Sequence, residues 1–285
     1  MKNILRLLAN NFLRVGGRLE QLSRTPPAYM DDIPSRDVLI KDIYAKMDAG
    51  VPWRKAMQDQ RASEHSERVV EYSYILAKVR EIKPKQLLDV GCVMNNPIID
   101  QYIPKECHVS FLNPALEPIV RSNATYHRSP MEDFVPTCEY DMVTCLSTIE
   151  HIGFDNTRYG TTITDQGWDW ERTIREFLDT LDRLRRLAPP QAPVIVSLPY
   201  GQKEFVRLPP VIGPRVWQVA HSEHIQASAN DPRLQGTRLT VLKLEGTGWR
   251  LSQPEEAYEP FGAVGTAASG VLIIEMNGVG GSSVV

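Results

Sequence analysis

Cysteine is scarce in this chain of 285 residues, and it has neither long apolar runs nor a strong excess of one charge. The four cysteines form no Cys-x-x-Cys pair, which argues against a disulfide-stapled secreted domain and indicates a reducing, cytoplasmic setting. No apolar run approaches the roughly 20 residues of a membrane-spanning helix, and no secretory signal is evident. The formal net charge of -3 gives no field that would attract nucleic acid.

The first 34 residues differ in composition from the rest. Over residues 1–22 apolar residues fall near one helical face, and four basic residues precede Glu20. Such a helix could lie on the inner face of a membrane, but we favour docking on the protein's own core or self-association, because Gly16-Gly17 interrupts the pattern. Prolines over residues 25–34 indicate a linker. The chain therefore divides into an N-terminal helix and linker (1–34), an α/β domain (35–277) and a flexible tail (278–285).

Beyond the linker, segments typical of strands alternate with segments typical of helices, which predicts a parallel sheet with crossover helices. One helix is expected over residues 63–82, with acids in its first turn. Another is expected over residues 168–188, where Pro189-Pro190 stops it. Strands are expected at residues 86–90, 108–112, 124–127, 140–145, 194–198 and 271–276.

The most informative segment closes the first of these strands. An apolar run ends in Asp89, Val90 and Gly91. In doubly wound folds, ligands bind outside the carboxyl ends of the strands, and a glycine after the first strand lets the backbone approach the ligand closely. Asn96 and Pro97 then form a good helix start, with Asn96 as N-cap and Pro97 as first helical residue.

Residues 87–92 (Leu-Leu-Asp-Val-Gly-Cys) resemble the first motif of class I S-adenosylmethionine-dependent methyltransferases. Later segments follow in that family's order: 111–114 resemble the end of its second strand, 129–134 the loop after its third, 140–143 its fourth strand, and 147–152 the segment after it. The resemblance implies a doubly wound, mostly parallel, Rossmann-like methyltransferase fold with an N-terminal helical extension. Within the family, residues 147–153 and the nearby Arg158-Tyr159-Gly160 look most similar to methyltransferases of bacterial surface glycans.

The resemblance also implies that S-adenosylmethionine is the cofactor. The residues it assigns to cofactor binding are Asp89, Gly91, Cys92, Asn113, Met131, Glu132 and Ser147. Taken alone, these residues allow other roles: Asp89 could cap backbone amides, Asn113, Met131 and Glu132 could belong to turns, and Cys92 could be a small packing residue.

Two departures from the family pattern bear on that site. The first loop usually carries further glycines, where this chain has Val93, Met94 and Asn95. An acid normally ends the second strand and receives the ribose hydroxyls, whereas Asn113 is uncharged. Cofactor binding could then be weaker, since charge-assisted hydrogen bonds are about twice as strong as neutral ones, or Glu117 could take over the ribose contact.

Methyl transfer to a hydroxyl needs alignment and a proton acceptor. His151 follows the fourth expected strand, where the site should open, and histidine titrates near neutrality, so we expect it to act as general base with Glu150 orienting it. Capping a helix is an equally good role for it. We expect Arg158 and Tyr159 to bind the substrate, a small molecule or glycan, because a planar donor fork and a flat ring suit polyhydroxyl recognition.

The pair His221 and His224 is a further substrate-binding candidate. It could also hold a metal, but without a third ligand at recognisable spacing we predict none. A non-catalytic or repurposed protein on the same fold is the rival interpretation. A nicotinamide-dependent oxidoreductase is disfavoured, because the first loop lacks the Gly-x-Gly-x-x-Gly phosphate cradle.

Overall fold

A computed structural model describes residues 14–15, 33–58, 66–154, 169–208, 215–246, 248–260 and 268–280. Its centre is an eight-stranded sheet in the order β10-β9-β11-β6-β5-β2-β3-β4. The parallel strands are β2 (Gln86–Val90), β3 (His108–Leu112), β4 (Ala124–His127), β5 (Met142–Leu146) and β6 (Pro193–Tyr200).

The other edge of the sheet is mixed. Strand β11 (Gly270–Asn277) runs antiparallel to both β6 and β9 (Arg238–Glu245), so β9 points the same way as the parallel set. Strand β10 (Gly248–Ser252) forms an antiparallel hairpin with β9. The sequence predicted β11 but missed β9 and β10, whose polar, half-exposed residues carry no continuous apolar run.

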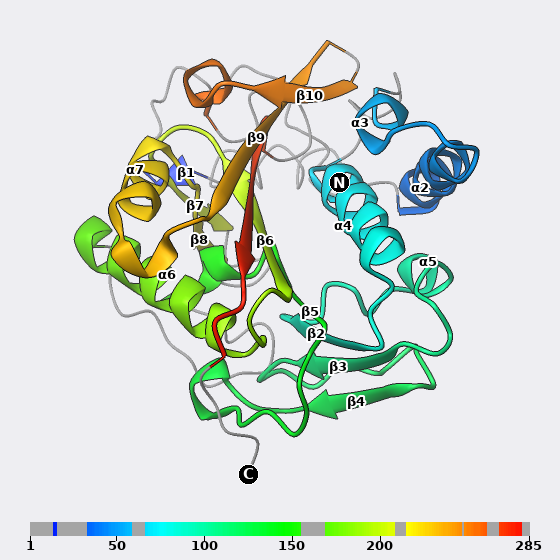
Figure 1. Ribbon diagram of the computed structural model, residues 1–285. Coiled ribbons are helices and arrows are strands. Elements are labelled where there is room, and N and C mark those ends of the chain that lie inside the picture. Colours follow the sequence, from blue (N-terminus) through cyan, green and yellow to red (C-terminus); the bar gives the residue numbers. More distant parts are fainter. Residues whose placement is uncertain are drawn as a thin grey trace, which may run out of the picture.

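Helices cover both faces of this sheet (Figure 1). On one face lie α2 (Ile33–Asp48), α3 (Trp53–Ala56), α4 (Arg68–Ile82) and α5 (Pro97–Asp100), and on the other lie α6 (Trp170–Arg186) and α7 (Ser222–Asn230). Two apolar clusters fill the space between helices and sheet, one around Ile75 of α4 and one around Phe177 of α6. The doubly wound, mostly parallel, Rossmann-like fold is thus confirmed.

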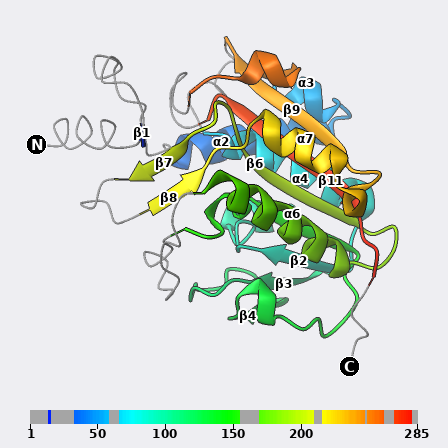
Figure 2. The same ribbon diagram turned by 90° about the vertical axis from the view of Figure 1, so that its left-hand side faces the viewer.

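A small second sheet, in the order β1-β7-β8, extends from one end of the main sheet (Figure 2). It contains β1 (Arg14–Val15), β7 (Phe205–Leu208) and β8 (Arg215–Gln218). Residues 14 and 15 pair with β7, so the helix expected over residues 1–22 is wrong at these two positions. The remainder of that expected helix lies outside the described residues.

Helix boundaries depend on local chemistry. Asn96 caps α5 as predicted: its side chain accepts a hydrogen bond from the Ile98 amide at 2.8 Å, and Pro97 is the first helical residue. Pro34, assigned to the linker, instead lies in the first turn of α2, where proline costs no helical hydrogen bond. In the described part of the chain, short 3₁₀ helices are η3 (Met131–Asp133), η4 (Ile149–His151), η6 (Pro232–Leu234) and η7 (Pro254–Ala257). No described helix is long and apolar enough to span a membrane.

Candidate functional site

A cavity of about 780 Å³ opens at the carboxyl ends of the parallel strands. It gathers segments that lie far apart in the sequence: the loop after β2, the links after β3 and β4, the segment after β5, the first turn of α4 and one side of α6. Of the residues assigned to cofactor binding or catalysis, the cavity lining includes Gly91, Cys92, Asn113, Met131, Glu132, Ser147 and His151.

The loop after β2 turns sharply into the cavity. Gly91 and Cys92 both have positive φ, +97° and 62°. A side chain at position 91 would collide with Thr148, which follows β5. Glycine is therefore required here both by backbone conformation and by the approach of a neighbouring segment. Burial raises the pKa of the Cys92 thiol well above its ordinary value, which keeps it protonated and agrees with a packing role.

Asp89 supports this loop from below and does not line the cavity. Its side chain is fully buried, and its carboxylate accepts hydrogen bonds from the Met94 amide at 2.8 Å and from the Thr144 hydroxyl at 2.7 Å. Burial raises its pKa to about 7, although both hydrogen bonds lower it. The backbone-capping alternative considered for Asp89 matches this geometry. A direct cofactor contact by Asp89 stays a prediction.

The link after β3 places a carboxylate in the cavity. Asn113 accepts a hydrogen bond from the Ala115 amide at 3.2 Å through Oδ1 and donates from Nδ2 to Glu117 Oε1 at 3.0 Å. Both residues line the cavity. Burial raises the pKa of Glu117, while the bond from Asn113 lowers it. A carboxylate therefore lines the cavity four residues after Asn113, and its contact with a ribose stays a prediction.

The link after β4 and helix α6 form the adjoining part of the cavity. Met131 lies on the lining and packs against the apolar cluster beneath it, while Glu132 is more exposed. Glu132 Oε1 pairs with Arg183 of α6 at 2.9 Å. This part of the lining therefore combines an apolar side chain with a pair of opposite charges.

The segment after β5 carries the proposed base. His151 lines the cavity, and its Nε2 lies 4.0 Å from Glu150 Oε1, which is ion-pair distance but too long for a hydrogen bond. Glu150 is buried and does not line the cavity. Burial raises its pKa well above its ordinary value, and Oε2 has no hydrogen-bond partner among the described residues. Orientation of His151 by a charged Glu150 therefore stays a prediction that this geometry does not favour.

Helix α4 contributes polar residues that the sequence did not reveal. Arg68 and Tyr72 line the cavity, and the Tyr72 hydroxyl donates to the Val93 carbonyl at 3.2 Å. Buried Glu71 receives hydrogen bonds from Ser147 at 2.5 Å and Ser197 at 2.7 Å, and it pairs with Arg68 at 2.7 Å. The available signal in the sequence was Glu71, a charged residue that directly follows the apolar pair Val69 and Val70 in this helix.

His221 and His224, two of the remaining candidates, lie outside the cavity lining. His221 and His224 are buried at the start of α7, where they form a capping box, and His224 Nε2 bonds to Gln218 Oε1 at 2.9 Å. Burial lowers the pKa of His221 to about 4. Neither lines the cavity, and no group of three or more potential metal ligands occurs among the described residues. Arg158 and Tyr159 lie outside the described residues.

No protein-family model and no curated protein matches the chain. Among solved structures it is similar to a 1,6-didemethyltoxoflavin N1-methyltransferase from Burkholderia thailandensis, with 12% identity, coverage of 89% of this chain and 92% of that chain, and a TM-score of 0.44. It is also similar to an amino pentose methyltransferase from Micromonospora echinaspora, with 14% identity, coverage of 82% and 95%, and a TM-score of 0.40. Likenesses this distant carry no conclusion about activity.

Proposed function

We propose that the protein is an S-adenosylmethionine-dependent methyltransferase that methylates a hydroxyl of a small molecule or glycan. The observation that carries this proposal is the shared cavity. Segments assigned separately to cofactor binding, around Gly91, Asn113, Met131 and Ser147, meet around one space with His151 at its lining. Its volume of about 780 Å³ lies toward the upper end of the usual range for ligand sites, which leaves room for a cofactor and a small acceptor.

The lining residues fit the chemical parts of this cofactor. The backbone at Gly91 leaves space where a side chain could not stand, and the Glu117 carboxylate can accept hydrogen bonds from the ribose hydroxyls. Met131 offers an apolar surface to the adenine, and the guanidinium of Arg68 complements a carboxylate. When bound, the cofactor supplies an activated methyl group on its sulfonium.

The protein's own task is then alignment and proton removal. His151 would accept the proton of the acceptor hydroxyl, since its side chain lies on the cavity lining. The segment Ile149–His151 is a 3₁₀ turn anchored by buried Ile149, which fixes the position of the imidazole relative to β5. Glu176, Asp179 and Thr180 of α6 border the same space and offer hydrogen-bonding groups to a polyhydroxyl acceptor.

A non-catalytic protein on the same fold is the second candidate. The observation that favours it is the uncharged Asn113 at the end of β3 together with the glycine-poor loop after β2. On this alternative the cavity would bind a different ligand or none. The presence of Glu117 in the lining weighs against it, because a carboxylate is retained beside the position where it would be needed.

Calorimetric titration of the purified protein with S-adenosylmethionine, S-adenosylhomocysteine and NAD separates these interpretations. Binding of the first two, and not of NAD, is the expected result. Absence of binding for all three would favour the non-catalytic alternative. Binding of NAD alone would overturn the proposal.

A further inference from the structure

The link between β3 and β4, residues 113–123, contains no helix. Pro114 and Pro118 account for this, because proline lacks a backbone N–H and disfavours helical geometry in the residue before it. The same link nevertheless supplies Asn113, Pro114 and Glu117 to the cavity. Since no helical hydrogen bonds hold the link, its shape depends on side chains that reach it from other segments.

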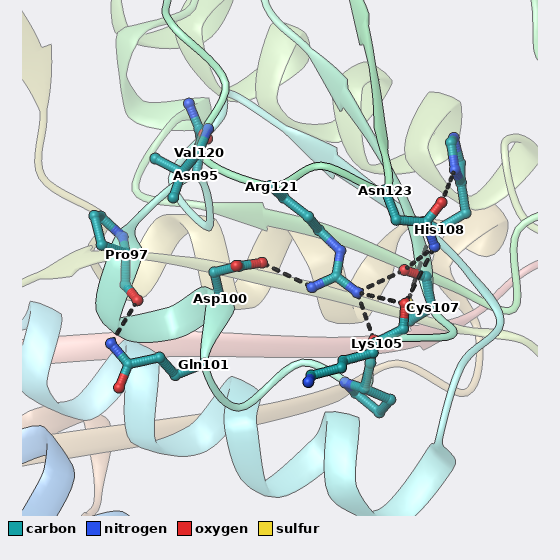
Figure 3. Close-up of polar contacts among 11 residues, drawn as sticks. Asn95, Pro97, Asp100, Gln101, Lys105, Cys107, His108, Val120, Arg121 and Asn123 are labelled. Atoms are coloured by element: carbon teal, nitrogen blue, oxygen red, sulfur yellow. Dashed lines mark hydrogen bonds and ion pairs between the residues drawn. The ribbon is translucent and has the colours of Figure 1, made fainter.

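Asn95, in the loop after β2, holds the middle of the link. Its Nδ2 donates to the Pro118 carbonyl at 2.9 Å, and its Oδ1 accepts from the Val120 amide at 2.9 Å. Figure 3 shows the Asn95 side chain beside Val120. The Asn95 side chain thus bonds to the backbone carbonyl of Pro118, the residue after Glu117, and to the backbone amide of Val120. The glycine that the family resemblance leads one to expect in this loop could make neither bond.

Arg121 holds the far end of the link. It is buried, and its guanidinium pairs with Asp100 of α5 at 2.7 Å (Figure 3). The same guanidinium donates to the carbonyls of Pro104, Lys105 and Cys107, which precede β3. Charge-assisted bonds to several carbonyls in a buried setting are among the stronger local restraints. Arg121 therefore fixes the link against α5 and the start of β3.

The near end of the link is fixed by residues already described. Asn113 bonds to the Ala115 amide and to Glu117 Oε1, and the Tyr126 hydroxyl donates to the Ala115 carbonyl. Asn113 supplies one donor to the Glu117 carboxylate, which has about four lone-pair positions. The carboxylate keeps capacity to receive further hydroxyl donors.

We propose that Asn95 and Arg121 are positioning residues for Glu117, and that together they set its carboxylate against the ribose hydroxyls of the bound cofactor. This inference rests on the proposed function. It gives the two departures from the family pattern a common explanation. The acid expected at the end of the second strand is replaced by Glu117, and a glycine expected in the first loop is replaced by Asn95, which holds Glu117 in place.

The test measures the affinity of the full chain for S-adenosylhomocysteine and for its 2′,3′-dideoxy analogue, which lacks the ribose hydroxyls. We expect Glu117→Gln to weaken S-adenosylhomocysteine binding by roughly tenfold, as loss of a hydrogen bond to a charged group implies. Asn95→Ala should weaken it by roughly as much, because the Glu117 carboxylate then loses its position. Binding of the dideoxy analogue should not change. Gln101→Ala removes an exposed side chain that bonds to the Pro97 carbonyl at 2.9 Å, and serves as the matched control.

The double variant Asn95→Ala/Glu117→Gln decides whether the two residues act together. If Asn95 acts through Glu117, the double variant should bind no more weakly than Glu117→Gln. Should Asn95→Ala fold poorly, Asn95→Asp keeps the acceptor for Val120 but turns a carboxylate oxygen toward the Pro118 carbonyl, so it should show a loss of the same kind. Additive losses, or equal losses for both ligands, would overturn the inference alone. Wild-type protein that binds neither ligand would overturn the proposed function.

Discussion

The two sides of the cavity are built by opposite means. The side formed by residues 113–123 is irregular backbone held by the neutral amides of Asn95 and Asn113, with Arg121 at its base. The side formed after β5 is held by the buried carboxylate of Glu71, which accepts from Ser147 and pairs with Arg68, and a second buried carboxylate, Glu150, precedes His151. An amide carries no charge that changes with pH, whereas burial raises the pKa of Glu150 well above its ordinary value. We expect the first arrangement to position a ligand and the second to serve the proton transfer proposed for His151.

The largest expected effect at a fixed pH comes from a side chain at Gly91, in the loop after β2 between the two sides. Gly91→Ala adds a side chain at φ +97° that collides with Thr148, which follows β5. We expect a loss of about 3 kcal/mol or more in the free energy of unfolding, from backbone strain plus overpacking. Urea unfolding measures it.

Gly50→Ala is the matched control, because Gly50 has a similar φ of +88° but nothing within 4 Å of the added carbon. It should lose only the strain contribution, about 1 kcal/mol. If the two variants lose equal stability, the contact between Gly91 and Thr148 does not constrain the loop.

His151→Ala tests the side formed after β5 alone. If His151 is the general base, the methylation rate should fall by roughly a hundredfold or more, since that is the usual contribution of a positioned proton acceptor. The affinity for S-adenosylhomocysteine should barely change. Steady-state rates and calorimetry separate the two quantities once an acceptor has been found by screening glycans and small hydroxyl compounds. Near-full turnover by the variant would leave alignment as the catalytic device.

The sequence predicted local features better than contacts between distant segments. Strand ends, the Asn96 cap and Gly91 were predictable because they are local, determined by a few adjacent residues and by chain order. The Glu71 network was not, because its members, Ser147 and Ser197, stand 76 and 126 residues away and meet only through the sheet. Asn95 appeared only as a missing glycine, since its partners lie on another link.

The pair His221 and His224 shows that one spacing can indicate two roles. Spacing on one helical face suggested a ligand-binding pair, but the same spacing satisfies the capping box that starts α7. Helix starts leave backbone amides without partners in every protein, so a polar pair at this spacing has a structural use more often than a binding one. The two uses cannot be separated without the position of the cavity.

Glu71→Gln removes the negative charge of the buried side chain that holds Ser147, Ser197 and Arg68, and it keeps the size of that side chain. The Ser147 and Ser197 hydroxyls can still donate to the amide oxygen, but Arg68 then faces an amide nitrogen in place of a carboxylate oxygen. We expect the free energy of unfolding to fall by about 2 kcal/mol, the value typical of a lost hydrogen bond to a charged group. Urea unfolding at pH 7 checks this.

Glu81→Gln on the same helix is the control. Glu81 pairs with Lys78 at 3.2 Å, but its side chain is 69% exposed, so the change should stay within about 0.5 kcal/mol. If both variants lose the same free energy of unfolding, the buried contacts of Glu71 do not stabilise the protein as proposed.

Asp89, which lies under the loop between the two sides, should make the stability of the protein depend on pH. Burial raises its folded-state pKa to about 7 from an ordinary 3.8. Between these values the unfolded chain has lost this proton and the folded chain has kept it, so the wild type should lose stability as the pH rises from about 4 to about 7. Asp89→Asn cannot ionise and can still accept from the Met94 amide, so its stability should lack this decline. Urea unfolding of both proteins from pH 4.5 to 8 measures the difference.

Thr144→Val sharpens the test, because the Thr144 hydroxyl lowers the Asp89 pKa and its removal should move the decline to higher pH. If stability changes with pH in the same way for wild type and Asp89→Asn, Asp89 is charged throughout this pH range.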